Sequence, residues 1–297
     1  MSDISRPHDS LFKEFLTDID IARQFLDIHL PDHIKQRCDL QTLELVSGAF
    51  VGNELKQRFA DIVYRVKVKG ENRFLYILVE HQSAAERLLP FRIAHYEMDI
   101  MRQYCDQTKS ETLPEIVSLV FYRGKTRYPY SLNVRDLLEY QDGQSVFAQQ
   151  IPTLIGISAL SDEEIQEHGN IAILEIVQKY VKEKDLQEFI QLVLIELTHH
   201  PLPTRRKNNL FRYLLSEGEC SDFENFYRIV HSYNPTYGEE MMTVAEQLKQ
   251  QGLEEAAVNM LQKHLSTDLI AEVTGFTKEK LIALAKRFNI SLEPQAQ

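Results

Sequence analysis

The sequence lacks any apolar run approaching the roughly 20 residues that a membrane-spanning helix needs. Its first residues include no apolar segment of the kind found in signal peptides, so nothing in them indicates export. It has only three cysteines, which lie far apart and without metal-ligand spacing, at positions 38, 105 and 220. Such cysteines are typical of reduced thiols in a cytosol. These absences predict a cytoplasmic protein with no membrane partner.

Positive charge is also scarce, because 33 Lys and Arg residues stand against 44 Asp and Glu residues, for a formal net charge of −11. Proteins that bind nucleic acid need Lys and Arg to neutralise phosphates. Residues 54–130 are the exception, with 13 basic against 10 acidic residues and a local net charge of +3. This distribution is compatible with modest, salt-sensitive DNA binding, and an unevenly charged solvated surface explains it equally well.

The order of the predicted elements indicates the fold class. At 297 residues, with 43% hydrophobic and 26% charged residues, the chain can bury a core and form about two globular domains. Alternating and apolar runs predict a hairpin, followed by a helix and a further strand, at 59–68, 74–79, 89–108 and 116–122. This order predicts an α/β fold with a mixed sheet flanked by helices.

Two domains are expected along the chain. The first covers residues 1–235 and ends in a helical extension at 161–233. A Pro- and Gly-containing segment at 234–238 predicts a linker, and residues 240–297 predict a small all-α unit. In that unit Ser266 and Thr277 can cap helices, and a small residue, a glycine and an aliphatic residue fall at helix-turn-helix offsets at Ala271, Gly275 and Leu281.

The second helix of this helix-turn-helix-like pattern offers few side chains that could read bases, since it continues as Ile282, Ala283 and Leu284. A dimerisation or regulatory role is therefore favoured over DNA contact for residues 240–297. The segment Gly238–Met242 would be encoded by purine-rich codons that could form a ribosome-binding site before an internal start. We therefore also consider a short C-terminal product of the same gene as a partner.

The predicted hairpin brings acidic side chains together. If the turn is centred on Gly70-Glu71, Asp61 pairs with Glu80; if the loop is two residues longer, Asp61 pairs with Gln82. Both registers place the three side chains on one face, because positions two apart share a face. Directly opposed Cβ atoms lie about 4.5–5.5 Å apart, so two carboxylates would repel unless a cation lay between them. An acid at a strand end is usually only a solvated charge, but the shared face favours an Mg²⁺ or Mn²⁺ site.

A divalent cation at this position could activate a water molecule and polarise a phosphate. Gln82 could hydrogen-bond that water, and Glu54 is a candidate supporting carboxylate from the preceding segment. Arg92 and Tyr96 lie one helical turn apart and point the same way, so they could contact phosphate or the carboxylates. A core tyrosine beside a surface arginine explains this pair equally well.

Five motifs occur in order at His8–Lys13, Ala60–Tyr64, Leu78–Ser83, Phe91–Tyr96 and Phe121–Lys125. Together they resemble the Rpn recombination-promoting nuclease family, also described as YhgA-like transposases, most clearly over residues 8–140. The resemblance implies a PD-(D/E)xK nuclease core and Mg²⁺-dependent cleavage of DNA, linked to recombination or to defence against foreign DNA. PD-(D/E)xK enzymes normally have a lysine where this chain has Gln82, and the family shares the glutamine.

We therefore predict a metal-dependent endonuclease acting on double-stranded DNA, as a homodimer because cutting both strands needs two active sites. Its catalytic residues are expected to be Asp61, Glu80 and Gln82, with Asp61 and Glu80 as metal ligands. Supporting roles are expected for Glu54, Tyr64, Arg92 and Tyr96, and DNA contacts for Arg65, Lys67, Arg123 and Lys125. The alternative is a non-enzymatic DNA-binding or regulatory protein on a decayed nuclease fold. A DDE transposase ranks last because no late acid lies in a convincing context.

Overall fold

The structure is a computed structural model that describes residues 7–46, 62–139 and 151–290. The chain divides into two compact units, Met1–Ser221 and Asp222–Gln297. Each unit has its own cluster of buried apolar side chains. The division precedes the predicted boundary at 235–240, because the helix before that boundary packs with the C-terminal unit.

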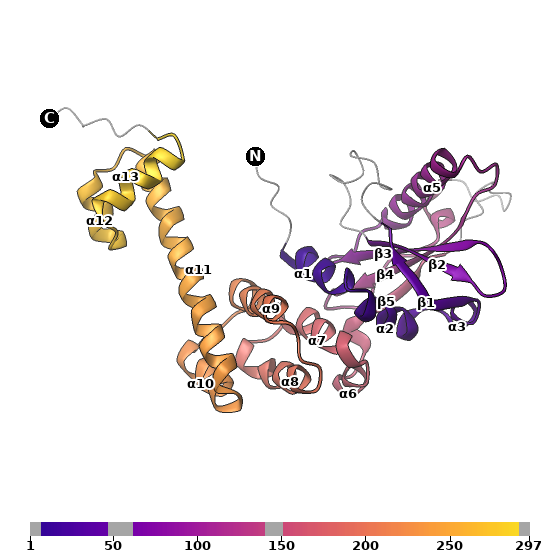
Figure 1. Cartoon of the computed structure of the whole chain (residues 1–297), viewed down its shortest axis with the longest axis horizontal. Coiled ribbons are helices and arrows are strands. Elements are labelled where there is room, and N and C mark those ends of the chain that lie inside the picture. The colour runs from indigo at the N-terminus through magenta and orange to yellow at the C-terminus, as the bar shows by residue number, and fades with distance from the viewer. Residues whose placement is uncertain (1–6, 47–61, 140–150, 291–297) are drawn as a thin grey trace. The chain divides into compact units, whose positions relative to one another are not determined.

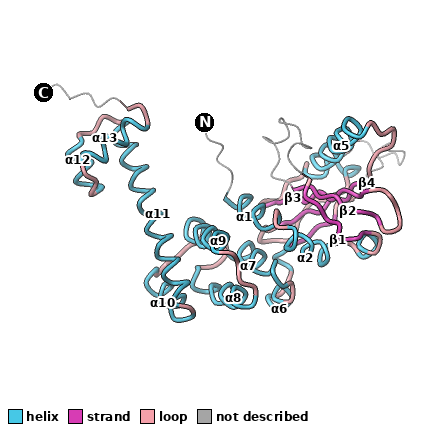
Figure 2. Tube along the Cα trace, viewed as in Figure 1, coloured by secondary structure: helices cyan, strands magenta, loops and turns pink. Residues whose placement is uncertain are grey.

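The first unit contains a five-stranded mixed sheet with strand order β1-β2-β3-β4-β5. Figure 1 and Figure 2 show this sheet with α5 beside it. β2 pairs antiparallel with both β1 and β3, whereas β3, β4 and β5 pair parallel to one another in that order. The strands are β1 (Cys38–Leu45), β2 (Ile62–Val68), β3 (Phe74–Gln82), β4 (Glu115–Tyr122) and β5 (Thr153–Gly156). The predicted mixed α/β sheet is confirmed, and β5 is a strand that we did not predict.

The β2–β3 hairpin has the shorter of the two predicted loops. Ile62 pairs with Val79 and Lys67 with Phe74, so the partner numbers sum to 141. Gly70 adopts the left-handed conformation at φ +73°, which a glycine accommodates without the steric cost that a Cβ would bring. This register sets which side chains share a face along the whole hairpin.

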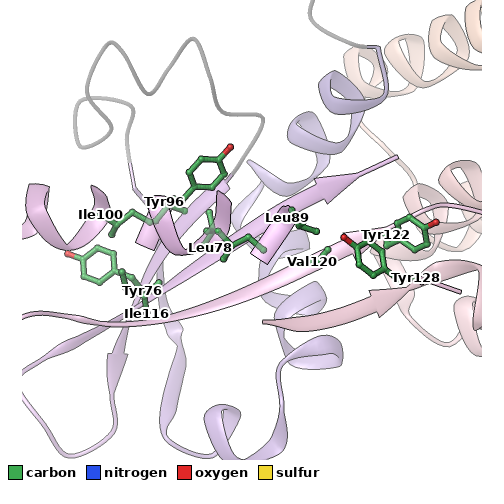
Figure 3. Close-up of a cluster of buried hydrophobic side chains, with 11 residues drawn as sticks. Tyr76, Leu78, Leu89, Tyr96, Ile100, Ile116, Val120, Tyr122 and Tyr128 are labelled. Carbon is green, nitrogen blue, oxygen red and sulfur yellow. The ribbon is translucent and has the colours of Figure 1, made fainter. Parts of the chain in front are cut away.

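One face of the sheet is covered by α5 (Leu89–Thr108), the connection between the parallel strands β3 and β4. The helix has the predicted bounds. Its apolar positions recur three or four residues apart and interlock with side chains of β3 and β4, as Figure 3 shows. The buried cluster comprises Val63, Tyr76, Leu78, Leu89, Ile93, Tyr96, Ile100, Ile116, Val120, Tyr122 and Tyr128.

The opposite face is covered by α1 (Pro7–Leu16) and α2 (Ile19–His29). Phe12 stacks on His81 with ring centroids 4.7 Å apart, and its ring lies 5.0 Å from that of Phe121. His81 is therefore packed between the rings of Phe12 and Phe121, on the face of β3 opposite Glu80.

The helices that follow β5 belong to the same unit as the sheet, because α1 packs against both α7 and α9. They correspond to the predicted helical extension, and they are α6 (Asp162–Gln166), α7 (Ala172–Tyr180), α8 (Leu186–His199) and α9 (Thr204–Glu217). Short elements complete the described part of this unit: α3 (Asp32–Lys35), η1 (Val134–Leu137), η2 (Ile157–Ala159) and η3 (Gly169–Ile171).

The second unit consists of α10 (Phe223–Tyr233), α11 (Pro235–Gln262), α12 (Thr267–Thr274) and α13 (Lys278–Arg287). The predicted linker at 234–238 is wrong, because this segment begins α11. The Asn234 side chain accepts hydrogen bonds from the backbone N–H groups of Thr236 and Tyr237, and Pro235 occupies the first helical position. An Asn N-cap followed by proline is a helix-start signal that outweighs the turn tendency of the same residues.

The end of α11 forms a small core with α12 and α13. Ser266 and Thr277 cap the last two helices as predicted, and Gly275 ends α12 in the left-handed conformation at φ +71°. Within the described ranges, none of the helices in either unit has the length and apolar character required to cross a membrane.

Candidate functional site

Polar residues gather where β3 and β4 end. Because these strands are parallel, their carboxyl ends lie at one edge of the sheet, the edge at which open α/β sheets commonly bind ligands. Gln82 pairs with Tyr122, the last residue of β4, and the backbone N–H of Arg123 donates to the Gln82 carbonyl oxygen at 3.0 Å. Glu80 lies two residues before Gln82 on the same face of β3.

Glu80 is a buried acid, with only 3% of its surface exposed. Its Oε1 accepts hydrogen bonds from Arg92 Nη2 at 2.6 Å and from Gln82 Nε2 at 2.5 Å. Its Oε2 is buried and has no hydrogen-bond partner among the described residues. Buried polar atoms are nearly always paired, so this free oxygen is the feature of the site that most needs a ligand.

Arg92 extends from the first turns of α5 to Glu80 and also forms an ion pair with Glu86, while its side chain remains 30% exposed. Burial lowers the pKa of Arg92, but the neighbouring Glu80, with smaller contributions from Tyr96 and Glu86, raises it above its ordinary value. The guanidinium therefore stays charged and holds one carboxylate oxygen of Glu80. Tyr96 lies one turn further along α5, buried in the apolar cluster of Figure 3.

Two predicted acids, Asp61 and Glu54, lie outside the described residues. Tyr64 needs a correction, because the structure places it on the opposite face of the sheet from Glu80. Its Cα partner is Ile77, and its hydroxyl donates to the backbone carbonyl of Leu16 at the end of α1. Burial raises the pKa of Tyr64 well above its usual range, so the phenol stays protonated and serves the packing of α1 rather than the site.

Two of the predicted DNA contacts lie toward the hairpin turn. Arg65 pairs with Tyr76, four residues from Glu80, which corresponds to about 14 Å along the strand. Its guanidinium forms an ion pair with Glu44 at 2.6 Å, and Lys67 lies two residues further away with an exposed side chain. The structure does not bring either residue to Glu80.

The other two predicted DNA contacts follow β4. Lys125 is mostly exposed and forms an ion pair with Glu183 at 2.9 Å. Arg123 lies at the same sheet edge as Gln82, and its Nε and Nη1 are buried without a hydrogen-bond partner among the described residues. Buried donors without a partner are costly, so these two nitrogens of Arg123 have capacity for an anionic ligand.

Glycine is required at position 124 by a close approach. A Cβ built there would overlap the ring of Tyr122, which is buried against Tyr128 in an edge-to-face arrangement with centroids 5.0 Å apart. The Tyr128 hydroxyl donates to the Glu86 carbonyl at 2.6 Å, which joins the segment after β4 to the loop that carries the second partner of Arg92. This glycine thus sets the path of the backbone next to Arg123.

Sequence reasoning missed three features of the described residues. Glu86 shares Arg92 with Glu80, and no motif marks it. Ser118 donates to buried Glu97 at 2.6 Å beneath α5. A further cluster at His29, His168 and Glu175 lies on the other side of the unit. The sequence feature that could have revealed this cluster is Glu175, a charged residue that interrupts the apolar start of α7.

Comparison with known proteins identifies the family. A profile described as "Putative transposase, YhgA-like" matches residues 6–207, more than half of the chain. The chain belongs to this family. It is 34% identical over 288 residues to the recombination-promoting nuclease RpnA of Escherichia coli K12, covering 95% of this chain and 98% of the relative. No solved structure matches it.

Other relatives carry both active and inactive names. The chain is 33% identical over 248 residues to the recombination-promoting nuclease RpnD of Escherichia coli O157:H7, covering 82% of this chain and 94% of that protein. It is also 33% identical over 293 residues to the inactive recombination-promoting nuclease-like protein RpnE of Escherichia coli K12, covering 93% and 96%. Overall sequence identity therefore does not separate the relatives named as nucleases from the relative named as inactive. Whether this chain has a nuclease site depends on the residues at the carboxyl edge of β3 and β4.

Proposed function

We propose that this chain is a metal-dependent endonuclease that hydrolyses phosphodiester bonds of double-stranded DNA on a PD-(D/E)xK core, in recombination or in defence against foreign DNA. The observation that carries the proposal is the buried carboxylate of Glu80, which has one oxygen held and one oxygen free at the carboxyl edge of β3 and β4. The nuclease names of the relatives support the reaction class. Cys38, Cys105 and Cys220 form no disulfide among the described residues, which suits a cytoplasmic enzyme.

The donor set at this edge fits Mg²⁺ or Mn²⁺, because Glu80 Oε2 is a hard oxygen without a partner among the described residues. We propose Asp61 as the second ligand, since it precedes Ile62 in the chain and Ile62 pairs with Val79 next to Glu80. A divalent cation would supply Lewis-acid activation of the attacking water and of the scissile phosphate.

The described residues have separate roles in this proposal. Arg92 and Gln82 fix Glu80 through Oε1, so that Oε2 is directed toward its ligand without a loss of side-chain entropy on binding. The Gln82 amide has a second N–H proton that can orient water, although it provides no positive charge where PD-(D/E)xK enzymes normally have lysine. Arg123 would bind a DNA phosphate with its unpaired guanidinium nitrogens.

Cleavage of supercoiled plasmid tests the proposal. The wild type should nick plasmid in Mg²⁺ and lose this activity in EDTA. Because a catalytic metal is worth several kcal/mol, Glu80→Gln and Asp61→Asn should each reduce cleavage by at least about 10²-fold. Glu71→Gln, at an exposed acid in the hairpin turn, is the matched control and should cleave normally. Unchanged cleavage by folded Glu80→Gln would refute the proposal.

The second candidate is a DNA-binding regulatory protein without nuclease activity. The relative with an inactive name favours it. Such a protein would retard DNA in a gel with or without Mg²⁺, and Glu80→Gln would not change this binding. An enzyme would instead keep DNA binding and lose cleavage in that variant.

We propose that the second unit mediates self-association, which would supply the two active sites needed to cut both strands. Leu269 and Val273, one turn apart on α12, are 44% and 57% exposed, and Ile282 of α13 is 41% exposed. These apolar side chains fit protein contact better than base readout. A product starting at Met241 or Met242 would retain the whole α12–α13 core and could bind the full-length chain through the same surface.

A further inference from the structure

The feature of the first unit that the proposed nuclease site leaves unused is a buried cluster of two imidazoles and one carboxylate. His29 is the last residue of α2, His168 precedes η3, and Glu175 lies on α7. Their side chains are 8%, 15% and 0% exposed. One nitrogen from each ring and one carboxylate oxygen of Glu175 all lie within 4.8 Å of one another.

We propose that His29, His168 and Glu175 form a structural binding site for Zn²⁺ that joins the helix layer on the sheet to the helical extension. His29 Nε2 lies 2.7 Å from Glu175 Oε1, and His168 Nδ1 lies 2.6 Å from Glu175 Oε2. Two histidines and one glutamate are a ligand set that proteins use for zinc, with water or another group in the fourth position. Two imidazole ligands select Zn²⁺ or Co²⁺ over Mg²⁺.

Metal binding needs a local adjustment of these side chains. Ligand atoms around a tetrahedral Zn²⁺ with bonds of roughly 2.0–2.1 Å are about 3.3 Å apart. The two hydrogen-bonded nitrogen–oxygen distances therefore have to grow by about 0.6 Å, and any longer separation within the 4.8 Å limit has to close toward the same value. The cation takes the place of the protons that lie between these nitrogens and Glu175, and each neutral imidazole then carries its proton on the other ring nitrogen.

The surroundings favour a structural rather than a catalytic metal. The Phe25 ring packs against His29 with centroids 4.7 Å apart, and the rings of His29 and His168 meet edge to face at 5.4 Å. These contacts fix the rings and limit access by a substrate. His29 and Glu175 are 146 residues apart in sequence, so a metal bond between them would constrain a long loop of chain.

The alternative is that the cluster binds no metal ion and that Glu175 is only hydrogen-bonded to both histidines. Zinc titration of the metal-stripped full-length chain, in excess Mg²⁺ to saturate the proposed nuclease site, separates the two. The readouts are zinc stoichiometry by equilibrium dialysis, the visible absorption of tetrahedral Co²⁺, and thermal unfolding. None of them depends on DNA cleavage, so failure here leaves the proposed function untouched.

The wild type should bind one Zn²⁺ per chain and unfold at a higher temperature with Zn²⁺ than without it. His168→Asn and Glu175→Gln should each weaken zinc binding by more than about 10²-fold, the upper end of the cost of losing an outer-shell partner. His33→Asn, at an exposed histidine on α3, is the matched control and should bind like the wild type. Because His168 lies outside a regular helix, its variant decides the test if Glu175→Gln fails to fold. Zinc affinity that is equal in wild type and His168→Asn, or absent in both, overturns the proposal.

Discussion

Replacement of Arg92 by methionine isolates the electrostatic role of this residue at the sheet edge. Methionine preserves much of the length and apolar contact of arginine but removes the positive charge. In Arg92→Met, Glu80 Oε1 would keep only Gln82 as a hydrogen-bond donor, and Oε2 has no partner among the described residues. The variant would therefore contain a buried carboxylate without a compensating charge.

The expected cost follows from burial. Breaking a buried ion pair by removing one partner costs about 3–5 kcal/mol. Arg92 is 30% exposed and is shared with Glu86, so the low end, about 3 kcal/mol, applies. For a unit of 221 residues, each kcal/mol shifts the melting temperature by about 2–4 °C, so the unit should melt roughly 6–12 °C earlier.

Thermal unfolding in EDTA, followed by circular dichroism, measures this shift. Adding Glu80→Gln to Arg92→Met should restore most of the lost stability, because it removes the buried charge itself. Mg²⁺ should raise the melting temperature more in Arg92→Met than in the wild type, since the bound cation would then supply the positive charge that the buried Glu80 carboxylate lacks. Arg102→Met, on an exposed arginine of the same helix, is the control and should cost at most about 1 kcal/mol. If Arg92→Met melts like the wild type, or Glu80→Gln gives no rescue, the reasoning is wrong.

Three further predictions follow from the described contacts. Gly124→Ala should cost about 1–3 kcal/mol and reduce DNA cleavage, because its Cβ would overlap the buried Tyr122 ring, whereas Gly156→Ala meets open space and should melt like the wild type. Hydrogen bonds from Arg37 at 2.8 and 2.6 Å lower the pKa of Glu115. Their contribution to stability, up to about 1 kcal/mol, is therefore present above pH ~4.3 and is lost as the pH falls through the lowered pKa. Urea unfolding should show that Arg37→Gln is less stable than the wild type at pH 7 and equally stable in acid. Val273→Lys should weaken self-association at least about tenfold in analytical ultracentrifugation, and an unchanged association constant would exclude α12 from the interface.

The local sequence pattern was sufficient to predict most helices and strands of the first unit. The helix at 89–108 was predicted with its observed bounds, because its apolar residues recur at helical spacing between a proline start and a polar end. The hairpin was predicted because period-two alternation meets a turn with glycine, although the choice between two registers stayed open. The strand at 153–156 was missed because four residues are too few to establish a period.

At the candidate site, strand alternation predicted that Glu80 and Gln82 share a face. It did not prevent the wrong assignment of Tyr64, although the same alternation puts Tyr64 opposite Glu80. The partners of each charge were not accessible to pattern reasoning. Arg65 and Lys125 are both cationic residues near the site in sequence, yet the first pairs with Glu44 and the second with Glu183.

The sequence by itself determined most elements of the first unit, the mixed sheet and the face on which Glu80 lies, because periodicity and turn residues act over a few neighbouring positions. Only the tertiary structure decided that Arg92 holds one oxygen of Glu80 and that the other stays free. It alone also brought His29 to Glu175 across 146 residues. Such contacts depend on how distant helices pack against the sheet, and no local pattern records which charged side chains that packing joins.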